Sequence, residues 1–277
     1  MNAWIDRIEN LDVSLFAAIP SQTSPGDRRS LLAVQRATAD RYKAYVYLEI
    51  GSHLGGSIQP HLADRRCRRI YSIDARPLQQ PDDRSPGYVA RYDDNSTARM
   101  LTLLGGTGAG DLAKIECFDF DAAEIDPRRI VCKPHIAFID GEHTQAAVMS
   151  DFRFCREVIR EGGTILFHDF SIVYPEILRI CRELNRQHVA HVPLKLEDEV
   201  FGIFFDPAVV DRDPYLLSLY RKNRKVMLGV RVKNWLRERL PAPLLKALRG
   251  TRNGLPKRTA VHNETSDGGP SVPLRRG

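Results

Sequence analysis

The chain has 277 residues, of which 43% are hydrophobic and 27% are charged, an ordinary balance for a globular protein large enough to bury a core. No apolar run approaches the roughly 20 residues of a membrane span, and the first residues lack the basic-then-apolar order of a secretory signal. Five cysteines, odd in number and without a C-x-x-C pair, indicate free thiols in a reducing cytoplasm.

The formal net charge of +6 is unevenly distributed. Residues 219–277 contain 15 Lys and Arg against 3 Asp and Glu, and the rest of the chain contains 26 against 32. The basic character therefore belongs to the C-terminal segment, while the remainder is mildly acidic. This distribution argues against a nucleic acid as the partner of the main body.

The first 44 residues are expected to form an N-terminal helical extension. A short helix and a loop should occupy residues 1–25. Asp27 is then placed to cap a helix that runs to about residue 40. The apolar side of that helix should consist of Leu31, Leu32, Val34 and Ala37.

The most informative stretch is the sequence V-Y-L-E-I-G-S-H-L-G-G-S, residues 46–57. It predicts a strand over 45–50, a glycine loop, and a helix over about 57–65 that begins at Ser57. Glycines let a backbone approach a ligand closely, and free N–H groups at a helix start favour its polar end. The spacing G-x-G-x-x-G of dinucleotide sites is absent. A second strand, 69–74, ends on Asp74, a carboxylate placed to accept hydrogen bonds from two ribose hydroxyls.

The remaining pattern alternates strands and helices. Residues 75–95 should form an irregular loop over a substrate. We expect helices at about 97–104, 144–161 and 174–187, and strands at 113–118, 135–139, 164–167, 190–196 and 200–205. The last two strands are so close in sequence that they must be antiparallel. Five βα units closed by an antiparallel hairpin predict an α/β fold.

Three motifs together resemble the class I S-adenosylmethionine (SAM) methyltransferases: E-I-G at 49–51, F-I-D-G-E-H at 138–143 and G-G-T-I-L-F-H-D at 162–169. The similarity is to a bacterial branch that includes macrolide and sugar O-methyltransferases and, more distantly, cephalosporin-hydroxylase-type proteins. It covers residues 45–205. It implies a Rossmann-like fold, with a mostly parallel sheet, a terminal antiparallel hairpin and helices on both faces, in a domain spanning 45–218.

This resemblance also implies a cofactor site for SAM. The residues it would contact are Glu49, Gly51, Ser52, Gly55, Ser57, Asp74, Phe120 and Asp121. Asp74 would hold the ribose, and Asp121 matches the acid that binds the exocyclic amine of adenine. Phe120 stands where the family usually has glycine. The alternative role for Asp121 is an N-cap of the following helix.

The expected catalytic residues are Asp140, His143 and Asp169. Asp140 and Asp169 end neighbouring strands, and together with His168 they would hold Mg²⁺ or another divalent cation that lowers the pKa of a substrate hydroxyl. His143, with a near-neutral pKa, is the predicted base. Metal-binding relatives carry two adjacent acids where this chain has His168-Asp169. The alternatives are a packed histidine at 168 and a helix cap at Asp140.

The C-terminal extension, residues 219–277, contains an apolar helical stripe with cationic flanks: Leu228, Val232, Trp235, Leu236 and Leu240. One interpretation is peripheral contact of residues 226–249 with the inner membrane face. The other is packing on the body or on a second subunit in a homodimer. From about residue 250 the composition predicts disorder.

The predicted function is SAM-dependent O-methylation of a hydroxyl on a small molecule or a sugar or glycan, in the cytoplasm of a bacterium. Two alternatives stay open. One is an RNA methyltransferase with a basic tail, which the acidic body and the lack of an N-P-P-Y motif weaken. The other is a hydroxylase-like relative that keeps the fold without methyl transfer.

Overall fold

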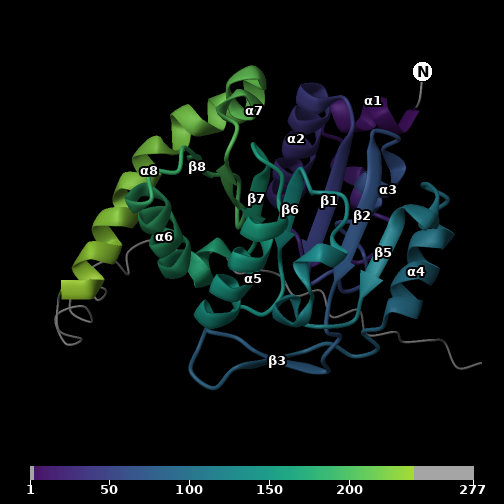
Figure 1. The fold of residues 1–277 in the computed structure, drawn as a ribbon, viewed down its shortest axis with the longest axis horizontal. Coiled ribbons are helices and arrows are strands. Elements are labelled where there is room, and N and C mark those ends of the chain that lie inside the picture. Colours follow the sequence, from purple (N-terminus) through teal and green to yellow (C-terminus); the bar gives the residue numbers. More distant parts are fainter. Residues whose placement is uncertain (1–2, 240–277) are drawn as a thin grey trace, which may run out of the picture. The chain divides into compact units, whose positions relative to one another are not determined.

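A computed structural model describes residues 3–239 of the chain, and its centre is a seven-stranded sheet (Figure 1). The sheet order is β5-β2-β1-β6-β7-β9-β8. The strands are β1 Tyr45–Ile50, β2 Cys67–Ile73, β5 Ile115–Phe118, β6 Ile136–Ile139, β7 Thr164–Phe167, β8 Val192–Lys195 and β9 Phe201–Phe204. The first five are parallel, whereas β9 runs antiparallel to both β7 and β8. This arrangement confirms the predicted mostly parallel sheet with a terminal antiparallel hairpin.

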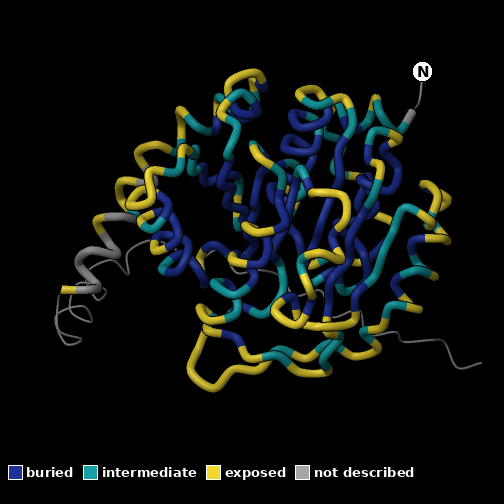
Figure 2. Tube along the Cα trace, in the orientation of Figure 1, coloured by how far each residue is buried: buried dark blue, intermediate teal, exposed yellow. Residues whose placement is uncertain are grey.

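The side chains of β1 alternate between two hydrophobic cores, one on each face of the sheet. Tyr45 and Tyr47 enter one core, and Val46, Leu48 and Ile50 enter the other. Both faces are covered, so the strand is buried along its whole length (Figure 2). Its C-terminal end, which leads into the glycine loop, is therefore fixed by packing on both faces of the sheet.

Helices cover the two faces. The first core includes residues of α1 Ala3–Glu9, α2 Pro25–Tyr42, α3 Gln59–Ala63, α4 Thr97–Gly106, α7 Pro207–Arg212 and the start of α8 Pro214–Arg239. The second is formed by α5 Gln145–Val158 and α6 Phe170–Arg186. Short 3-10 turns are η1 Val13–Phe16, η2 Leu112–Lys114, η3 Ala122–Glu124 and η4 Pro127–Arg129. The helices of residues 3–44 thus contribute to the same core as the sheet.

Three predicted helix starts differ from the observed ones. Ser24, not Asp27, is the N-cap of α2, because Asp27 is the third helical residue of a reciprocal capping box with Ser24. Turns occupy residues 53–58, and α3 begins only at Gln59, since Ser57 turns inward to bond Glu49. α6 begins at Phe170 rather than near 174, because Asp169 turns the chain directly out of β7.

The segment 75–95, predicted as irregular, contains a two-stranded antiparallel hairpin, β3 Gln79–Pro81 and β4 Val89–Arg91. It lies across the ends of the strands, at one end of the sheet (Figure 1). Backbone contacts fasten it to the loop after β6, where the Asp83 N–H donates to the His143 carbonyl over 3.1 Å. This hydrogen bond attaches the hairpin segment to the loop that carries His143.

The chain divides into two units, residues 1–231 and residues 232–277. Much of the predicted apolar stripe falls outside the described part: Leu240 lies beyond it, and the side chains of Trp235 and Leu236 are not described. Leu228 and Val232 are exposed. None of the helices within residues 3–239 combines the length and apolarity that crossing a bilayer requires.

Candidate active site

The glycine loop after β1 is built from backbone conformations that restrict its sequence. Gly51 has φ +88°, and a Cβ on it would lie 2.1 Å from the Asp140 carbonyl oxygen. Only glycine fits there, since any side chain would push the loop away from the end of β6. His53 also has a positive φ of 43°, a strained conformation for a residue with a Cβ. The loop is therefore held tightly against the carboxyl edge of the sheet.

Asp74, at the end of β2, supports this loop. Its Oδ2 accepts from the His53 N–H and its Oδ1 accepts from the Arg76 N–H, each over 2.8 Å. The Arg76 guanidinium lies 3.3 Å from the same carboxylate. A carboxylate has about four acceptor positions, so Asp74 retains lone pairs for the diol that the sequence predicted as its partner.

Two of the predicted cofactor residues lie behind the loop. Glu49 is fully buried and accepts hydrogen bonds from the hydroxyls of Ser57 and Tyr47. Burial and the negative charge of Asp140 raise the pKa of Glu49 to about 8, although the hydrogen bond from Ser57 acts in the opposite direction. Gly55 faces Met100 and Leu104 of α4. Both residues thus support the loop from the core side, and neither is among the described residues that line the two cavities at this end of the sheet.

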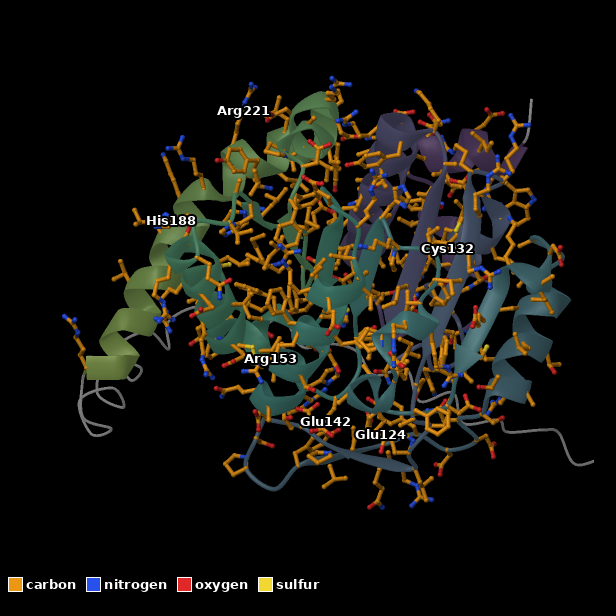
Figure 3. The ribbon with its side chains drawn as sticks, viewed as in Figure 1. Glu124, Cys132, Glu142, Arg153, His188 and Arg221 are labelled. Carbon is orange, nitrogen blue, oxygen red and sulfur yellow. The ribbon has the colours of Figure 1, made fainter. Side chains whose placement is uncertain are left out.

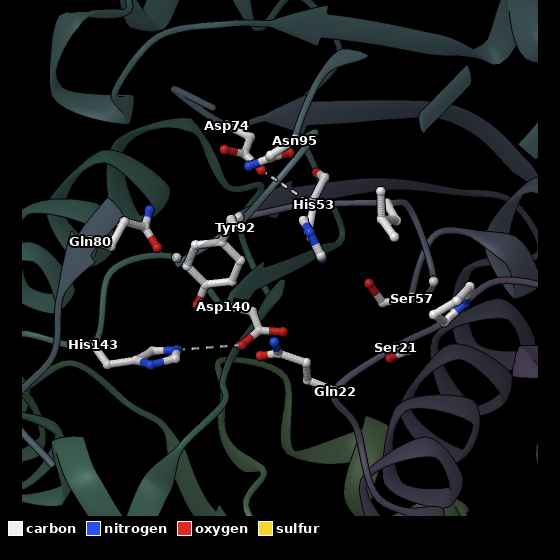
Figure 4. A pocket seen from close by; sticks show the side chains of 16 residues that line it. Ser21, Gln22, His53, Ser57, Asp74, Gln80, Tyr92, Asn95, Asp140 and His143 are labelled. Carbon is white, nitrogen blue, oxygen red and sulfur yellow. Dashed lines mark hydrogen bonds and ion pairs between the residues drawn. The ribbon is translucent and has the colours of Figure 1, made fainter. Parts of the chain in front are cut away.

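Two adjoining cavities open at this edge and share Gly51, Asp74, Gln80 and Gly141. The first, the loop cavity, is lined by the glycine loop, Asp140 and His143 (Figure 4). The second, the α5 cavity, has a volume of about 430 Å³ and is lined by Phe120, Asp121 and part of α5. Phe120 is half exposed, and Asp121 makes no capping bond to η3. An elongated ligand can therefore cross Asp74 and occupy both cavities.

Beyond the loop cavity, four carboxylates and two imidazoles form a continuous cluster. Both ring nitrogens of His143 face carboxylates, to which the protonated ring donates: Nδ1 lies 2.9 Å from Asp82 Oδ2, and Nε2 lies 2.9 Å from Asp169 Oδ2. His168 Nδ1 lies 3.0 Å from Asp140 Oδ1 and 3.1 Å from Asp169 Oδ2. On its other side, His168 Nε2 is 3.4 Å from a carboxylate oxygen of Asp27. The acids outnumber the imidazoles, so the cluster stays anionic even when both imidazoles are protonated.

This environment changes the expected acid–base behaviour. Burial lowers the pKa of His143, but hydrogen bonds and charge from Asp140 and Asp169 outweigh it and raise the pKa to about 10. The expected near-neutral pKa is therefore wrong for this arrangement, because no local pattern indicates that two acids lie beside one imidazole ring. Burial also opposes the charged form of His168, and Asp140 in turn raises its pKa well above the usual range.

The residues fit a divalent cation. Ligand atoms of Asp140, His143 and Asp169 all lie within 4.8 Å of one another. Carboxylate oxygens with an imidazole suit Mg²⁺ or Mn²⁺. The predicted ligand set named His168 in place of His143. In the structure His143 lines the loop cavity and His168 does not. His168 instead lies between Asp27 and the acids that end β6 and β7, so its contacts favour a positioning role.

Sequence reasoning missed the outer members of the cluster. Asp82 belongs to the hairpin segment and Asp27 to α2, and neither adjoins a motif. The pairing of Asp82 with His143 spans 61 residues and that of Asp27 with His168 spans 141, which no local pattern reveals. The one signal for Asp82 in the sequence is that it lies in the segment 75–95, which was expected to cover the substrate.

Residues 48–170 match the family model described as a methyltransferase domain. This part of the chain is a methyltransferase domain. Its strand order and glycine loop agree with the class I, SAM-dependent kind that the sequence motifs resemble. The match begins within β1 and ends at the start of α6, and it therefore includes every predicted cofactor and catalytic residue.

A curated relative, the uncharacterized protein R132 of Acanthamoeba polyphaga mimivirus, is 25% identical over 130 residues. The match covers 45% of this chain and 51% of the viral protein, so the chain spans about half the length of the curated relative it matches. A bacterial origin stays a prediction.

Several solved structures are similar at low identity. The O-methyltransferase NovP has a TM-score of 0.49 and 14% identity, covering 72% of this chain and 79% of NovP. CalS11, a calicheamicin methyltransferase, has a TM-score of 0.47 and 14% identity, with coverage of 72% and 91%. MycE of mycinamycin biosynthesis, in complex with Mg and SAH, has a TM-score of 0.46 and 15% identity, with coverage of 71% and 53%.

Proposed function

We propose that the methyltransferase domain transfers the methyl group of SAM to a hydroxyl of a small, polyhydroxylated acceptor such as a sugar. The observation that carries this proposal is the convergence of Asp140, His143 and Asp169 beside the glycine loop. The arrangement combines groups that bind a hydroxyl, move its proton and hold a cation next to the cofactor cavity.

The chain's own residues fit SAM. Ser52 is buried at the loop cavity, and its hydroxyl has no hydrogen-bond partner among residues 3–239, which leaves it available to the polar end of the cofactor. Asp74 would accept from the ribose hydroxyls, and the α5 cavity would take the base. When bound, SAM supplies an electrophilic methyl on a sulfonium, and a divalent cation would polarise the acceptor hydroxyl.

With a cation held by the carboxylates of Asp140 and Asp169, Nε2 of His143 would stay free of the metal, and His143 is proposed as the group that removes the acceptor proton through this nitrogen. In the structure it is held protonated by the carboxylates that surround it. It loses its proton more readily when positive charge is bound at Asp140 and Asp169, because those carboxylates are what raise its pKa. Asp82 fixes the ring from the opposite nitrogen, so that Nε2 keeps facing the cavity.

The lining of the loop cavity favours an acceptor rich in hydroxyls. The amide groups of Gln22 and Gln80 face it in Figure 4, and within the described chain neither makes a side-chain hydrogen bond. Free amides both donate and accept, as recognition of a sugar requires. Tyr92 supplies an aromatic surface. No lysine or arginine is among the described residues that line the loop cavity, so the cavity offers no cationic side chain to an anionic acceptor.

The direct test measures two things in turn. Calorimetry with S-adenosylhomocysteine (SAH) establishes cofactor binding, and labelled SAM with panels of glycosides, phenols and amines identifies the acceptor. We expect methylation of hydroxyls on glycosides, lost in Asp140→Asn and reduced by EDTA. Methylation confined to RNA or to amines would contradict the proposal, as would the absence of SAH binding.

The finer domain boundaries, peripheral membrane contact and a homodimer stay predictions of the same proposal. Residues 45–218 would be the catalytic domain, and the basic segment 219–277 a separate attachment element. The support for an attachment role of this basic segment is the charge distribution alone.

A further inference from the structure

A buried acid on α5 breaks the pattern of its helix. The inward side of α5 consists of Val148, Phe152, Cys155 and Val158, and Asp151 falls on that same side with only 8% of its surface exposed. Arg153, two positions further, lies on the exposed side (Figure 3). A carboxyl group at a core position costs stability unless something binds it.

Within residues 3–239 no partner compensates Asp151. No side chain or backbone N–H donates a hydrogen bond to its carboxyl, and no cation pairs with it. Burial, and then the charges of Asp121 and Glu142, raise the pKa of Asp151 to about 7. The buried carboxyl group therefore has acceptor positions that no donor among the described residues fills.

The α5 cavity explains what it faces. Asp151 lines this cavity together with the small apolar side chains of Ala122, Ala146 and Ala147, which leave a slot suited to a flat ring. Asp74 borders the same cavity, so a nucleoside whose ribose meets Asp74 places its base in this slot. Among the described residues, the charged side chains that line this cavity are all acidic. The slot therefore favours the edge of a nucleobase that presents hydrogen-bond donors.

We propose that Asp151 reads the exocyclic amino group of the adenine ring of SAM. This inference rests on the proposed function. It assigns base recognition to an acid inside α5 rather than to Asp121, the acid at the end of β5 that the sequence predicted. Asp121 also lines the cavity but is exposed to water, where a hydrogen bond contributes little to discrimination.

The test uses calorimetry with SAH and four proteins: the parent chain, Asp151→Ala, Asp151→Asn and Asp121→Ala. Asp151→Ala should weaken SAH binding by about 10- to 100-fold, as expected for a hydrogen bond to a charged or strongly polar buried group. Asp151→Asn should stay within about threefold of the parent, because its amide oxygen still accepts from the amino group. Asp121→Ala, the matched control on the same cavity, should also stay within about threefold.

A second ligand separates recognition from simple packing. An SAH analogue whose purine lacks the 6-amino group should bind the parent about tenfold more weakly than SAH, whereas Asp151→Ala should bind the two equally. If the parent fails to discriminate, the inference is overturned even where a variant does not fold. Unchanged SAH affinity in Asp151→Ala also overturns it and leaves the proposed function intact. A parent chain that binds no SAH overturns both.

Discussion

At the residue scale, the site depends on how carboxylates are distributed around imidazoles. His143 is fixed at both nitrogens, and His168 joins the two acids that end β6 and β7 to Asp27. Asp169 itself has a left-handed φ of 49° and makes no capping bond to α6, so its carboxylate is free to serve the cluster. The strain at Asp169 is consistent with a functional position.

Replacing Asp82 should impair turnover without affecting cofactor binding. Asp82→Asn keeps the size of the side chain but removes the charge that orients and stabilises the protonated ring of His143, so we expect kcat to fall about 10- to 100-fold. The affinity for SAH, measured by calorimetry, should not change. Asp93→Asn, an exposed acid beyond β4, is the control. Equal kcat in the two variants would remove Asp82 from the mechanism.

Glu49 should make stability fall with pH. Its pKa is raised in the folded protein from 4.5 to about 8, so the folded state binds the proton more tightly than the unfolded state. The free energy of unfolding should therefore decrease as pH rises from about 4.5 to 8, by an amount on the order of 1–4 kcal/mol. Urea titrations of ligand-free protein across this window measure it. Glu49→Gln should flatten the slope, and a slope identical to that of the parent would disprove the assignment.

At the element scale, α2 locks the N-terminal helices to the catalytic edge. Asp27, inside the first turn of α2, accepts from the backbone N–H of Ser24 at 2.8 Å and of Glu199 at 2.7 Å, and lies beside His168. One side chain therefore connects the helix start, the β8–β9 turn and the end of β7. The N-terminal segment is thus bound into the architecture of the site.

Asp27→Ala should lower the free energy of unfolding by about 2–4 kcal/mol, because it leaves two N–H groups without their acceptor and removes the carboxylate paired with the buried imidazole of His168. Denaturant titration measures the loss. Asp40→Ala, at the exposed end of the same helix, should change it by less than about 0.5 kcal/mol. Equal effects of the two substitutions would show that Asp27 is not a structural lock.

At the scale of the whole molecule, the residues of the site all fall within the unit 1–231. The C-terminal segment is basic, whereas the rest of the chain is mildly acidic. Cofactor binding should therefore not require the residues after Arg231.

A chain ending at Arg231 should bind SAH with the affinity of the full chain, within about twofold, as calorimetry would show. If the basic segment contacts anionic lipid, only the full chain should co-sediment with phosphatidylglycerol vesicles, and high salt should release it. A truncated chain that loses SAH binding would mean that the segment belongs to the fold. Absence of co-sedimentation at low salt would reject the membrane interpretation.

The sheet, the glycine loop and the acids at the strand ends could be predicted from the sequence. These features are encoded locally: a continuous apolar run specifies β1, Gly51 specifies the turn, and Asp74, Asp140 and Asp169 directly follow their strands. The other members of the site are brought together only by the tertiary structure. Asp82, Asp27 and Asp151 join the site from a hairpin, a helix start and a helix interior, far away in sequence. The pKa of His143 depends on these approaches, because protonation responds to distance and burial, which only the folded chain sets.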